Sequence, residues 1–428
     1  MIGQVENMLP YISAVFGSAL MLVLLVILLL RYFGTIFAPS STLGQKLAGG
    51  PAGKKAAGSW RDALLCSVLW FAVSRAFVFV VALLYARLAG YDWYLTNMPS
   101  HWIKWDAPHY IGLIENWYVN EGDPRFHIVF FPMYPLVCRM LLPLFQGNAE
   151  LSAFVVSNLC GIAAGAFLYR LAVLDFGRAA AGRATKFLFL NPLSFFLSLP
   201  YTESMFLLLT VAAVYLARRR KYALALLCGA MCAACRLMGI VVAIPIFYSM
   251  LSQDKEEGRL GARRVLLRVL ACCAVLVGVA AYLLLNWRVT GNPFQFWIYQ
   301  EEHWHNTTGT LWNTFDYIVR YALMHDPNMQ WGTWIPTIAA LYGAIVLLCV
   351  RWRRMNPGDA AYGWAYMYMS IVPTWLISGP RYVSGMYCLY PALGSWAKRR
   401  SLDVALSVLS ALALGFMACM FVFRHGVY

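Results

Sequence analysis

Residues 12–30 read ISAVFGSALMLVLLVILLL, an apolar run without a charged side chain that ends at Arg31. A run of about 20 such residues can cross the ~30 Å hydrocarbon core of a bilayer as a helix. Similar runs recur along all 428 residues, of which 61% are hydrophobic and only 12% are charged. A soluble domain is typically about 45–50% apolar and about 25% charged. The composition therefore argues against a soluble enzyme, a disordered chain or a disulfide-stapled module, and it predicts an all-α polytopic membrane protein.

Basic residues gather in short segments between the apolar runs, and the positive-inside rule places such segments in the cytoplasm. The formal net charge of +15 is then explained by membrane orientation and by attraction to anionic lipids, and it does not indicate a nucleic-acid partner. The basic segments are Lys46–Arg61, Arg178–Lys186, Arg218–Lys221, Lys255–Arg264, Arg351–Arg354 and Lys398–Arg400.

Two long connections, about residues 90–128 and 287–330, have more acidic than basic side chains and many Trp, Tyr and His residues. We expect these loops on the outer side of the membrane. The hydropathy pattern predicts about 12 spans in total, some of them short enough to form the helical hairpins 187–217 and 222–250. The stretch 129–146 could span the membrane or form a re-entrant, surface-lying helix, and the basic cluster that follows it favours the second alternative.

Two acidic side chains stand out among the polar motifs of the predicted outer side. Asp106 lies in an aromatic stretch, where partial burial would raise the pKa of a carboxyl toward the working range of a general base. A helix N-terminus is the alternative interpretation, because an Ala-Pro pair follows directly. Glu203 follows a Pro-Tyr-Thr turn, and its alternatives are helix capping or a solvated hairpin tip.

Three arginines are candidates for functional cations. Arg236 interrupts an apolar run and could clamp a phosphate with forked hydrogen bonds, or its side chain could extend to the membrane surface. Arg381 follows Gly-Pro and is a second phosphate candidate, with an exposed loop position as the alternative. Arg75 lies in the middle of a span and could pair with a carboxylate of another helix.

A divalent metal is a further open alternative, held by outer-loop histidines with Asp106 or Glu302. The spacing of these residues is not a known ligand pattern, so the sequence assigns no metal ligand. The Cys232–Cys235 pair lies in an apolar run, and we interpret the two cysteines as small side chains packed in the protein interior. The histidines of the predicted outer loops are His101, His109, His127, His303, His305 and His325.

Several motifs, taken in order, resemble the PIG-V family of mannosyltransferases, which adds the second mannose to GPI anchors in eukaryotes and has bacterial relatives. The likeness covers roughly residues 64–395, and only the ordered set of motifs makes it specific. One mild departure is Tyr-Thr-Glu-Ser in place of the family's Tyr-Ser-Glu-Ser. The motifs are Trp105-Asp106 with His109-Tyr110, Phe130–Leu136, Asn191-Pro192 with Ser194, Tyr201–Ser204, Arg236 with Gly239, Gln300–Trp304 and Pro380–Tyr382.

The resemblance implies a C-type membrane glycosyltransferase that takes a sugar from a polyprenyl-phosphate carrier on the outer or lumenal face. It implies that Asp106 is the catalytic acidic residue of the first outer loop. The carrier would donate to a lipid or glycan acceptor, and the aromatic outer loops would form platforms for the sugars. The implied substrate-binding residues are Trp105, His109, Tyr110, Tyr201, Glu203, Arg236, Gln300, Trp304 and Arg381.

On this interpretation residues 1–62 are an added N-terminal span with a basic cytoplasmic loop, and residues 63–428 form the glycosyltransferase domain. A bacterial plasma membrane is the expected location, or the endoplasmic reticulum in a eukaryote. Two rival functions remain open. A protein O-mannosyltransferase would use the same chemistry on another acceptor, and a lipid-linked sugar transporter or flippase would need paired midplane charges and two similar halves. No internal repeat is visible.

Overall fold

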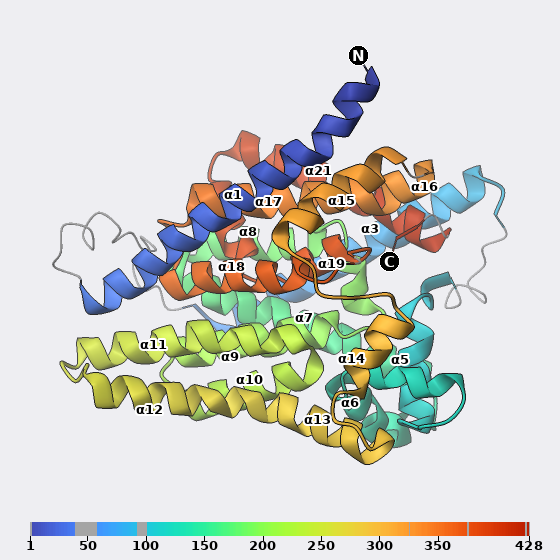
Figure 1. Ribbon diagram of the computed structural model, residues 1–428. Helices are drawn as coiled ribbons and strands as arrows, with labels where there is room; N and C mark the ends of the chain where they lie inside the picture. The colour runs from blue at the N-terminus through green and yellow to red at the C-terminus, as the bar shows by residue number, and fades with distance from the viewer. Residues whose placement is uncertain are drawn as a thin grey trace.

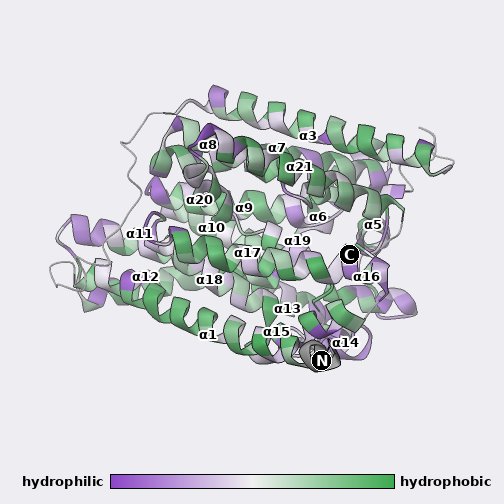
Figure 2. Cartoon of the chain, turned by 90° about the horizontal axis from the view of Figure 1, so that it is seen from above, coloured by the Kyte–Doolittle hydropathy of each residue, from purple (hydrophilic) through white to green (hydrophobic). Residues whose placement is uncertain are grey.

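The computed structural model describes residues 2–38, 58–91, 101–324, 326–374, 376–423 and 426–427, with side chains from Met8 onward. Within these residues the chain forms a bundle of helices without any strand (Figure 1). Hydrophobic residues cover the helices along most of their length, while hydrophilic residues collect toward the two ends of the bundle (Figure 2). The fold is therefore the all-α polytopic membrane architecture that the hydropathy predicts.

Seven helical segments of the described chain are long and apolar enough to cross a membrane. Three of them are built from shorter pieces. These are η4 (Leu237–Val242) with α11 (Ala243–Glu256), α12 (Ala262–Cys272) with η5 (Cys273–Val275) and α13 (Leu276–Thr290), and α16 (Pro327–Met329) with η6 (Gln330–Trp334) and α17 (Ile335–Arg351). The other long helices are α1 (Ile2–Phe37), α3 (Trp60–Leu88), α7 (Ala149–Phe176) and α21 (Arg400–Val422).

The count of about 12 spans is not confirmed, because several helices within the bundle are short. A helix rises about 1.5 Å per residue, so the 16 residues of α9 extend about 24 Å, less than the bilayer core. The short helices instead pack among the long ones, with α7 against both α8 and α9. They are α8 (Arg178–Leu190), α9 (Glu203–Arg218), α10 (Tyr222–Cys235), α18 (Pro357–Ile371), α19 (Gly379–Ser384) and α20 (Leu389–Trp396).

The two predicted outer loops contain helices of their own and meet at one end of the bundle, where α14 packs against η1. At the start of the stretch 129–146, η1 meets the segment Met133–Phe145 at a bend of 113°, a geometry that a broken span and a re-entrant segment share, so both alternatives stay open. The helices of the first loop and its end are α5 (Asp106–Asn116), η1 (Asp123–Val129), α6 (Met133–Leu141) and η2 (Leu142–Phe145). Those of the second loop are α14 (Gln295–Glu302), α15 (Leu311–Met324) and the α16–η6 segment.

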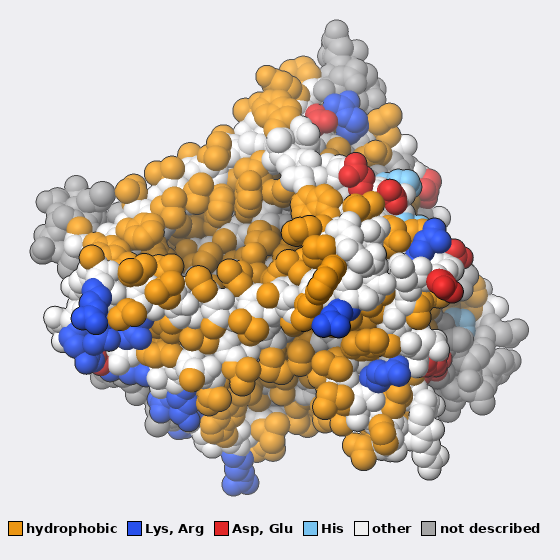
Figure 3. Space-filling model, turned by 60° about the horizontal axis from the view of Figure 1, so that its bottom comes forward, with side chains coloured by type: hydrophobic (Ala, Val, Ile, Leu, Met, Phe, Trp, Pro, Cys, Tyr) orange, Lys and Arg blue, Asp and Glu red, His pale blue; other side chains and the backbone are white. Residues whose placement is uncertain are grey.

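Charge separates along the bundle. The face in Figure 3 has clusters of Lys and Arg at one end, acidic and His side chains together with a few Lys and Arg toward the other, and mostly hydrophobic side chains between them. This is the arrangement expected for a membrane protein whose basic end faces the cytoplasm. The first and second outer loops lie at the acidic end.

Helix α1 packs against α15 and α18 and is tied to the bundle by a buried arginine. Arg31 is fully buried and donates to the carbonyls of Trp352 and, at 2.7 Å, of Met355, at the end of α17. Carbonyls at a helix C-terminus have no partner within the helix and attract a cation. The division of the chain at residue 62 remains a prediction.

Arg75 does not pair with a carboxylate through any hydrogen bond of the described side chains. Its Nη2 donates to the carbonyl of Ser194 at 2.5 Å, and its guanidinium lies 4.9 Å from the ring of Phe71. Arg75 thereby fixes η3 (Ser194–Ser198), the short turn that carries Phe196 into the site described below.

Candidate active site

The two candidate carboxylates start two different helices. Asp106 is the first residue of α5 and Glu203 the first of α9, at the ends where a helix dipole favours negative charge. Neither helix has a side-chain capping hydrogen bond at its N-cap residue, which is Trp105 in α5 and Thr202 in α9. The helix N-terminus given as the alternative for Asp106 is therefore present, and both carboxylates in addition bind arginines.

Arg381 joins these carboxylates although it is far from both in sequence. Its Nε donates to Oε1 of Glu203 at 2.8 Å, and its Nη2 donates to Oδ2 of Asp106 at 2.9 Å. The side chain is only 4% exposed, so the exposed-loop alternative is wrong for Arg381. The planar guanidinium can bridge two carboxylates because its donors form a fixed fork.

Arg236 completes a cluster of four charges by donating from Nη2 to the same Glu203 oxygen at 2.6 Å. Its side chain is 13% exposed and is held by Glu203 instead of extending into solvent. The chain reverses at Arg236, between α10 and η4, and this reversal requires Gly239. A Cβ at Gly239 would lie 2.3 Å from the backbone of Cys232 in α10, so no larger residue fits in the Arg-x-x-Gly motif.

Burial distinguishes the two carboxylates. The Glu203 side chain is 3% exposed and is held between two arginines, whereas the Asp106 side chain is 31% exposed. Several buried polar atoms of this region have no hydrogen-bond partner among the described residues, including Glu203 Oε2, Arg236 Nη1 and Tyr366 Oη. Buried polar groups are normally satisfied, so these atoms are suited to the polar groups of a bound substrate.

Aromatic rings surround the four charges. The guanidinium of Arg381 lies 5.0 Å from the ring of Phe196 and 4.9 Å from that of Tyr201. Tyr110 contacts Tyr201 with ring centroids 6.4 Å apart, so two of the expected substrate-binding tyrosines adjoin the cluster. No sequence pattern distinguishes Phe196 or Tyr366, since both lie in ordinary apolar runs.

A histidine pair joins α5, one turn beyond Asp106, to η1. His109 Nδ1 and His127 Nε2 are 3.0 Å apart and share a hydrogen bond. Phe130 packs on His109 at 5.4 Å and on Trp304 at 5.9 Å, which connects the two outer loops beside Asp106. Burial lowers the pKa of the His109 imidazole below its ordinary value of 6.5, and the Asp106 carboxylate offsets this only in part.

Two further expected substrate-binding residues, Trp105 and Gln300, are held by packing and by a backbone hydrogen bond. Trp105 packs against the hydrophobic core, and the backbone carbonyl of Gln300 accepts from Asn306. Among the described residues no three His, Cys, Asp or Glu side chains are grouped to hold a metal ion. His325 lies outside the described residues.

Comparison with protein families identifies the chain. The sequence model of the mannosyltransferase (PIG-V) family matches residues 64–321, more than half of the 428 residues. The chain belongs to the PIG-V family. This membership and the apolar helices indicate a membrane protein of a mannosyltransferase family. The match covers Asp106, Glu203 and Arg236, whereas Arg381 lies beyond its end.

Two crystal structures of the Archaeoglobus fulgidus oligosaccharyltransferase are similar to this PIG-V family member, one in complex with Zn and sulfate and one tethered with an acceptor peptide. The sequence identities are 15% and 14%, and the TM-scores are 0.45 and 0.43. The alignments cover 82% and 83% of this chain but 53% and 55% of those chains, so the protein spans about half their length. A search of curated proteins found no match.

The His109–His127 pair predicts a specific dependence on residue type and pH. Burial lowers the pKa of both imidazoles, that of His127 to about 4, so both rings stay neutral near pH 7 and transfer should decline only below pH 6.5. Asp106 and His303 are the neighbouring groups that act on His109, in opposite directions. We expect His127→Leu to lower the initial rate about 2–10-fold and His127→Gln, whose amide can replace Nε2, to retain it. Equal rates for the two variants between pH 5 and 8 would contradict the prediction.

Proposed function

We propose that this protein transfers mannose, or a related hexose, from a polyprenyl-phosphate carrier to a lipid or glycan acceptor on the outer face of the membrane. The observation that carries the proposal is the cluster in which Arg381 and Arg236 hold Glu203 while Asp106 remains partly exposed. Cations buried beside an accessible carboxylate are what the transfer of a phosphate-linked sugar needs.

The charge balance of the cluster fits each stage of such a reaction. Two carboxylates and two guanidiniums sum to zero, and the bound donor adds one negative charge at its phosphodiester. When the sugar carbon leaves the carrier phosphate and bonds to the acceptor oxygen, Asp106 takes the acceptor's proton. Asp106 then becomes neutral beside Arg381 as the departing phosphate gains its second negative charge. Arg381 can therefore exchange one anion for the other without a net change of charge in the site.

The roles of the other residues follow from their positions. Glu203 accepts hydrogen bonds from both arginines. We therefore propose that it orients the two guanidiniums and does not take a proton. His109 and Trp304 both pack on Phe130, Tyr110 contacts Tyr201, and these three residues are proposed to bind sugar rings. Aromatic faces provide large, rigid contacts for the apolar side of a sugar ring.

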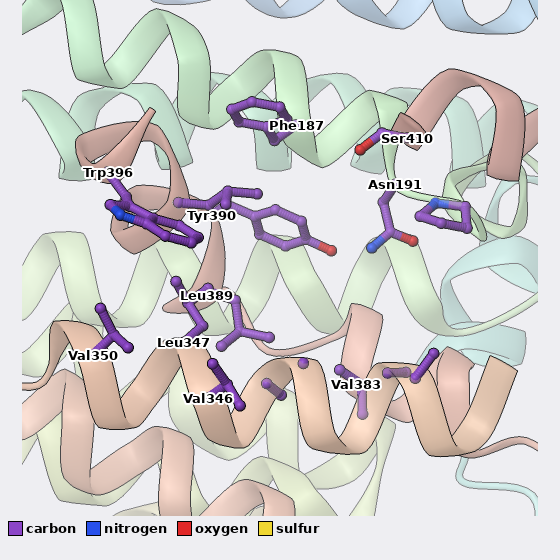
Figure 4. Close-up of a pocket in the computed structure, with 16 residues that line it drawn as sticks. Phe187, Asn191, Val346, Leu347, Val350, Val383, Leu389, Tyr390, Trp396 and Ser410 are labelled. Carbon is purple, nitrogen blue, oxygen red and sulfur yellow. The ribbon is translucent and has the colours of Figure 1, made fainter. Parts of the chain in front are cut away.

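An apolar groove beside the site supports a donor with an isoprenoid chain. The groove has a volume of about 380 Å³ and is lined by residues of α8, α17, α19, α20 and α21. Val346, Leu347 and Val350 of α17 face Tyr390 and Trp396 across it (Figure 4). Val383 also lines the groove and follows Arg381 by two residues on α19, so a chain in the groove would end near the phosphate site.

A variant that fills this groove is expected to impair binding of a long-chain donor only. Gly343 of α17 lines the groove, and a Cβ there meets no other atom within 4 Å, so Gly343→Leu should fold normally. We expect KM for polyprenyl-phosphate mannose to rise about tenfold or more, because each buried methylene contributes ~0.8 kcal/mol. KM for a short-chain analogue of the donor should change little.

Gly182→Leu is the matched control, since Gly182 of α8 also has open space around its Cα and lies outside the groove. The groove would lose its assigned role if Gly343→Leu left both KM values unchanged, or if it raised them equally.

The direct test of the proposed function is incubation of the purified protein with radiolabelled polyprenyl-phosphate mannose and membrane extract. Label that appears in a lipid or glycan supports the proposal, and label in a protein hydroxyl supports the O-mannosyltransferase alternative. Label that crosses the membrane of a vesicle while still attached to its carrier identifies a flippase and overturns the proposal.

A further inference from the structure

Lys104 is a buried lysine two residues before Asp106, and the proposed reaction does not use it directly. Its side chain is in the bundle interior, where the residue is 7% exposed. Nζ donates to the carbonyl of Phe421 at 3.0 Å and also to that of Val422, and it lies 5.8 Å from the Phe421 ring. These carbonyls belong to the last turn of α21, the negative end of a 23-residue helix. Lys104 therefore anchors the chain before Asp106 to the end of the last span.

The segment anchored in this way is a strained turn. The Ala107 N–H donates to the Lys104 carbonyl at 3.0 Å, so Lys104–Ala107 forms a four-residue turn. Trp105, at the second position, has φ 53° and ψ −111°, the geometry of a type II′ turn. That position is normally glycine, because a side chain at positive φ is strained. A tryptophan stays there only if neighbouring contacts hold the turn closed.

A second contact closes the turn from the opposite side. The Tyr201 hydroxyl, fully buried, donates to the same Lys104 carbonyl at 2.6 Å. Its ring lies against the Arg381 guanidinium, which in turn binds Asp106. The hydroxyl of Tyr201 is therefore committed to the turn, and its ring is the part that faces the charged cluster.

We propose that Lys104 is a positioning residue, which grips the carbonyl end of α21 and keeps the Trp105 turn closed so that the Asp106 carboxylate meets Arg381 and the acceptor hydroxyl. This inference rests on the proposed role of Asp106 as base. If the turn relaxed, the carboxylate would shift while the substrate-binding surfaces stayed in place. The rate of the chemical step should therefore suffer more than substrate affinity.

The test compares Lys104→Met, which keeps the length of the side chain but removes its charge, with Lys104→Arg, which keeps a cation and its donors. We expect Lys104→Met to lower kcat at least about tenfold, since misplacing a reacting group by ~1 Å can cost about 100-fold. KM for the donor should stay within about twofold of wild type. Lys104→Arg should regain kcat to within about threefold. Unchanged kcat in Lys104→Met, or equal losses in both variants, would overturn the inference.

Tyr201→Phe removes only the hydroxyl from the same turn and provides a second arm. It should lower kcat with little change in KM, and its effect combined with Lys104→Met should be smaller than the product of the single effects. If Lys104→Met does not yield a monodisperse folded protein, an unchanged kcat in Tyr201→Phe overturns the inference by itself. Lys398→Met, in the exposed basic cluster at the other end, is the control with wild-type kcat.

These outcomes are separable from failure of the proposed function. A fully active Asp106→Asn variant would reject Asp106 as the base, irrespective of the result for Lys104. An inactive Asp106→Asn variant together with a fully active Lys104→Met variant would contradict the positioning role alone.

Discussion

Asp106→Asn is expected to lower kcat of sugar transfer about 10³-fold, the middle of the range for loss of a general base. The amide has nearly the same shape and can still accept a hydrogen bond from Arg381 through its oxygen, so the structure of the site should be retained. It cannot take the proton of the acceptor hydroxyl. The measurement is the initial rate of label transfer at saturating donor, with KM of the donor determined in parallel.

Glu115→Gln is the matched control, because Glu115 lies on the same helix α5 with an exposed side chain. It should transfer sugar at the wild-type rate. An Asp106→Asn variant within about threefold of wild type would rule out Asp106 as the base, and the mechanism would then need another proton acceptor.

Arg381→Met is expected to have the second largest effect, because one side chain serves both carboxylates. Its loss leaves Asp106 without its described hydrogen-bond partner and Glu203 with Arg236 alone. Removing one partner from a buried ion pair costs about 3–5 kcal/mol of stability, less for the partly exposed Asp106. Loss of the phosphate partner should also lower kcat by about 10²–10³-fold. The thermal midpoint and the transfer rate are the two measurements.

Arg381→Lys separates charge from shape. An ammonium retains the positive charge, but it lacks the planar fork that bridges two carboxylates, so we expect an intermediate loss of rate. Arg320→Lys is the control, since Arg320 makes a forked contact with Asp316 on the exposed outer surface. It should change neither rate nor stability. A fully active Arg381→Lys variant would show that the fork is not required.

The sequence predicts the membrane architecture well because a bilayer imposes long apolar segments that can be read directly. The count of spans is harder, since short helices such as α9 and α10 are stabilised by packing on longer neighbours and not by crossing the bilayer alone. The bend between η1 and α6 is likewise a tertiary feature, although Pro132 marks its position in the sequence.

The site was predictable as a set of residue types but not as an arrangement. Asp106, Glu203, Arg236 and Arg381 are unusual in apolar surroundings, and this made each a candidate. Their pairing depends on the packing of α5, α9, η4 and α19, over separations of up to 275 residues. Lys104 could not be predicted as a site residue, because a lysine in a loop is usually exposed to solvent and its burial is evident only in the structure.

The bridge through Arg381 also determines how much of the chain is needed to make an enzyme. A protein cut after residue 321, where the family match ends, would retain Asp106, Glu203 and Arg236 of the four-charge cluster but not Arg381. Neither the bridging guanidinium nor the helix end that receives Lys104 would remain. On the proposed mechanism the smallest catalytic unit extends beyond residue 321, and we expect a fragment cut there to be inert.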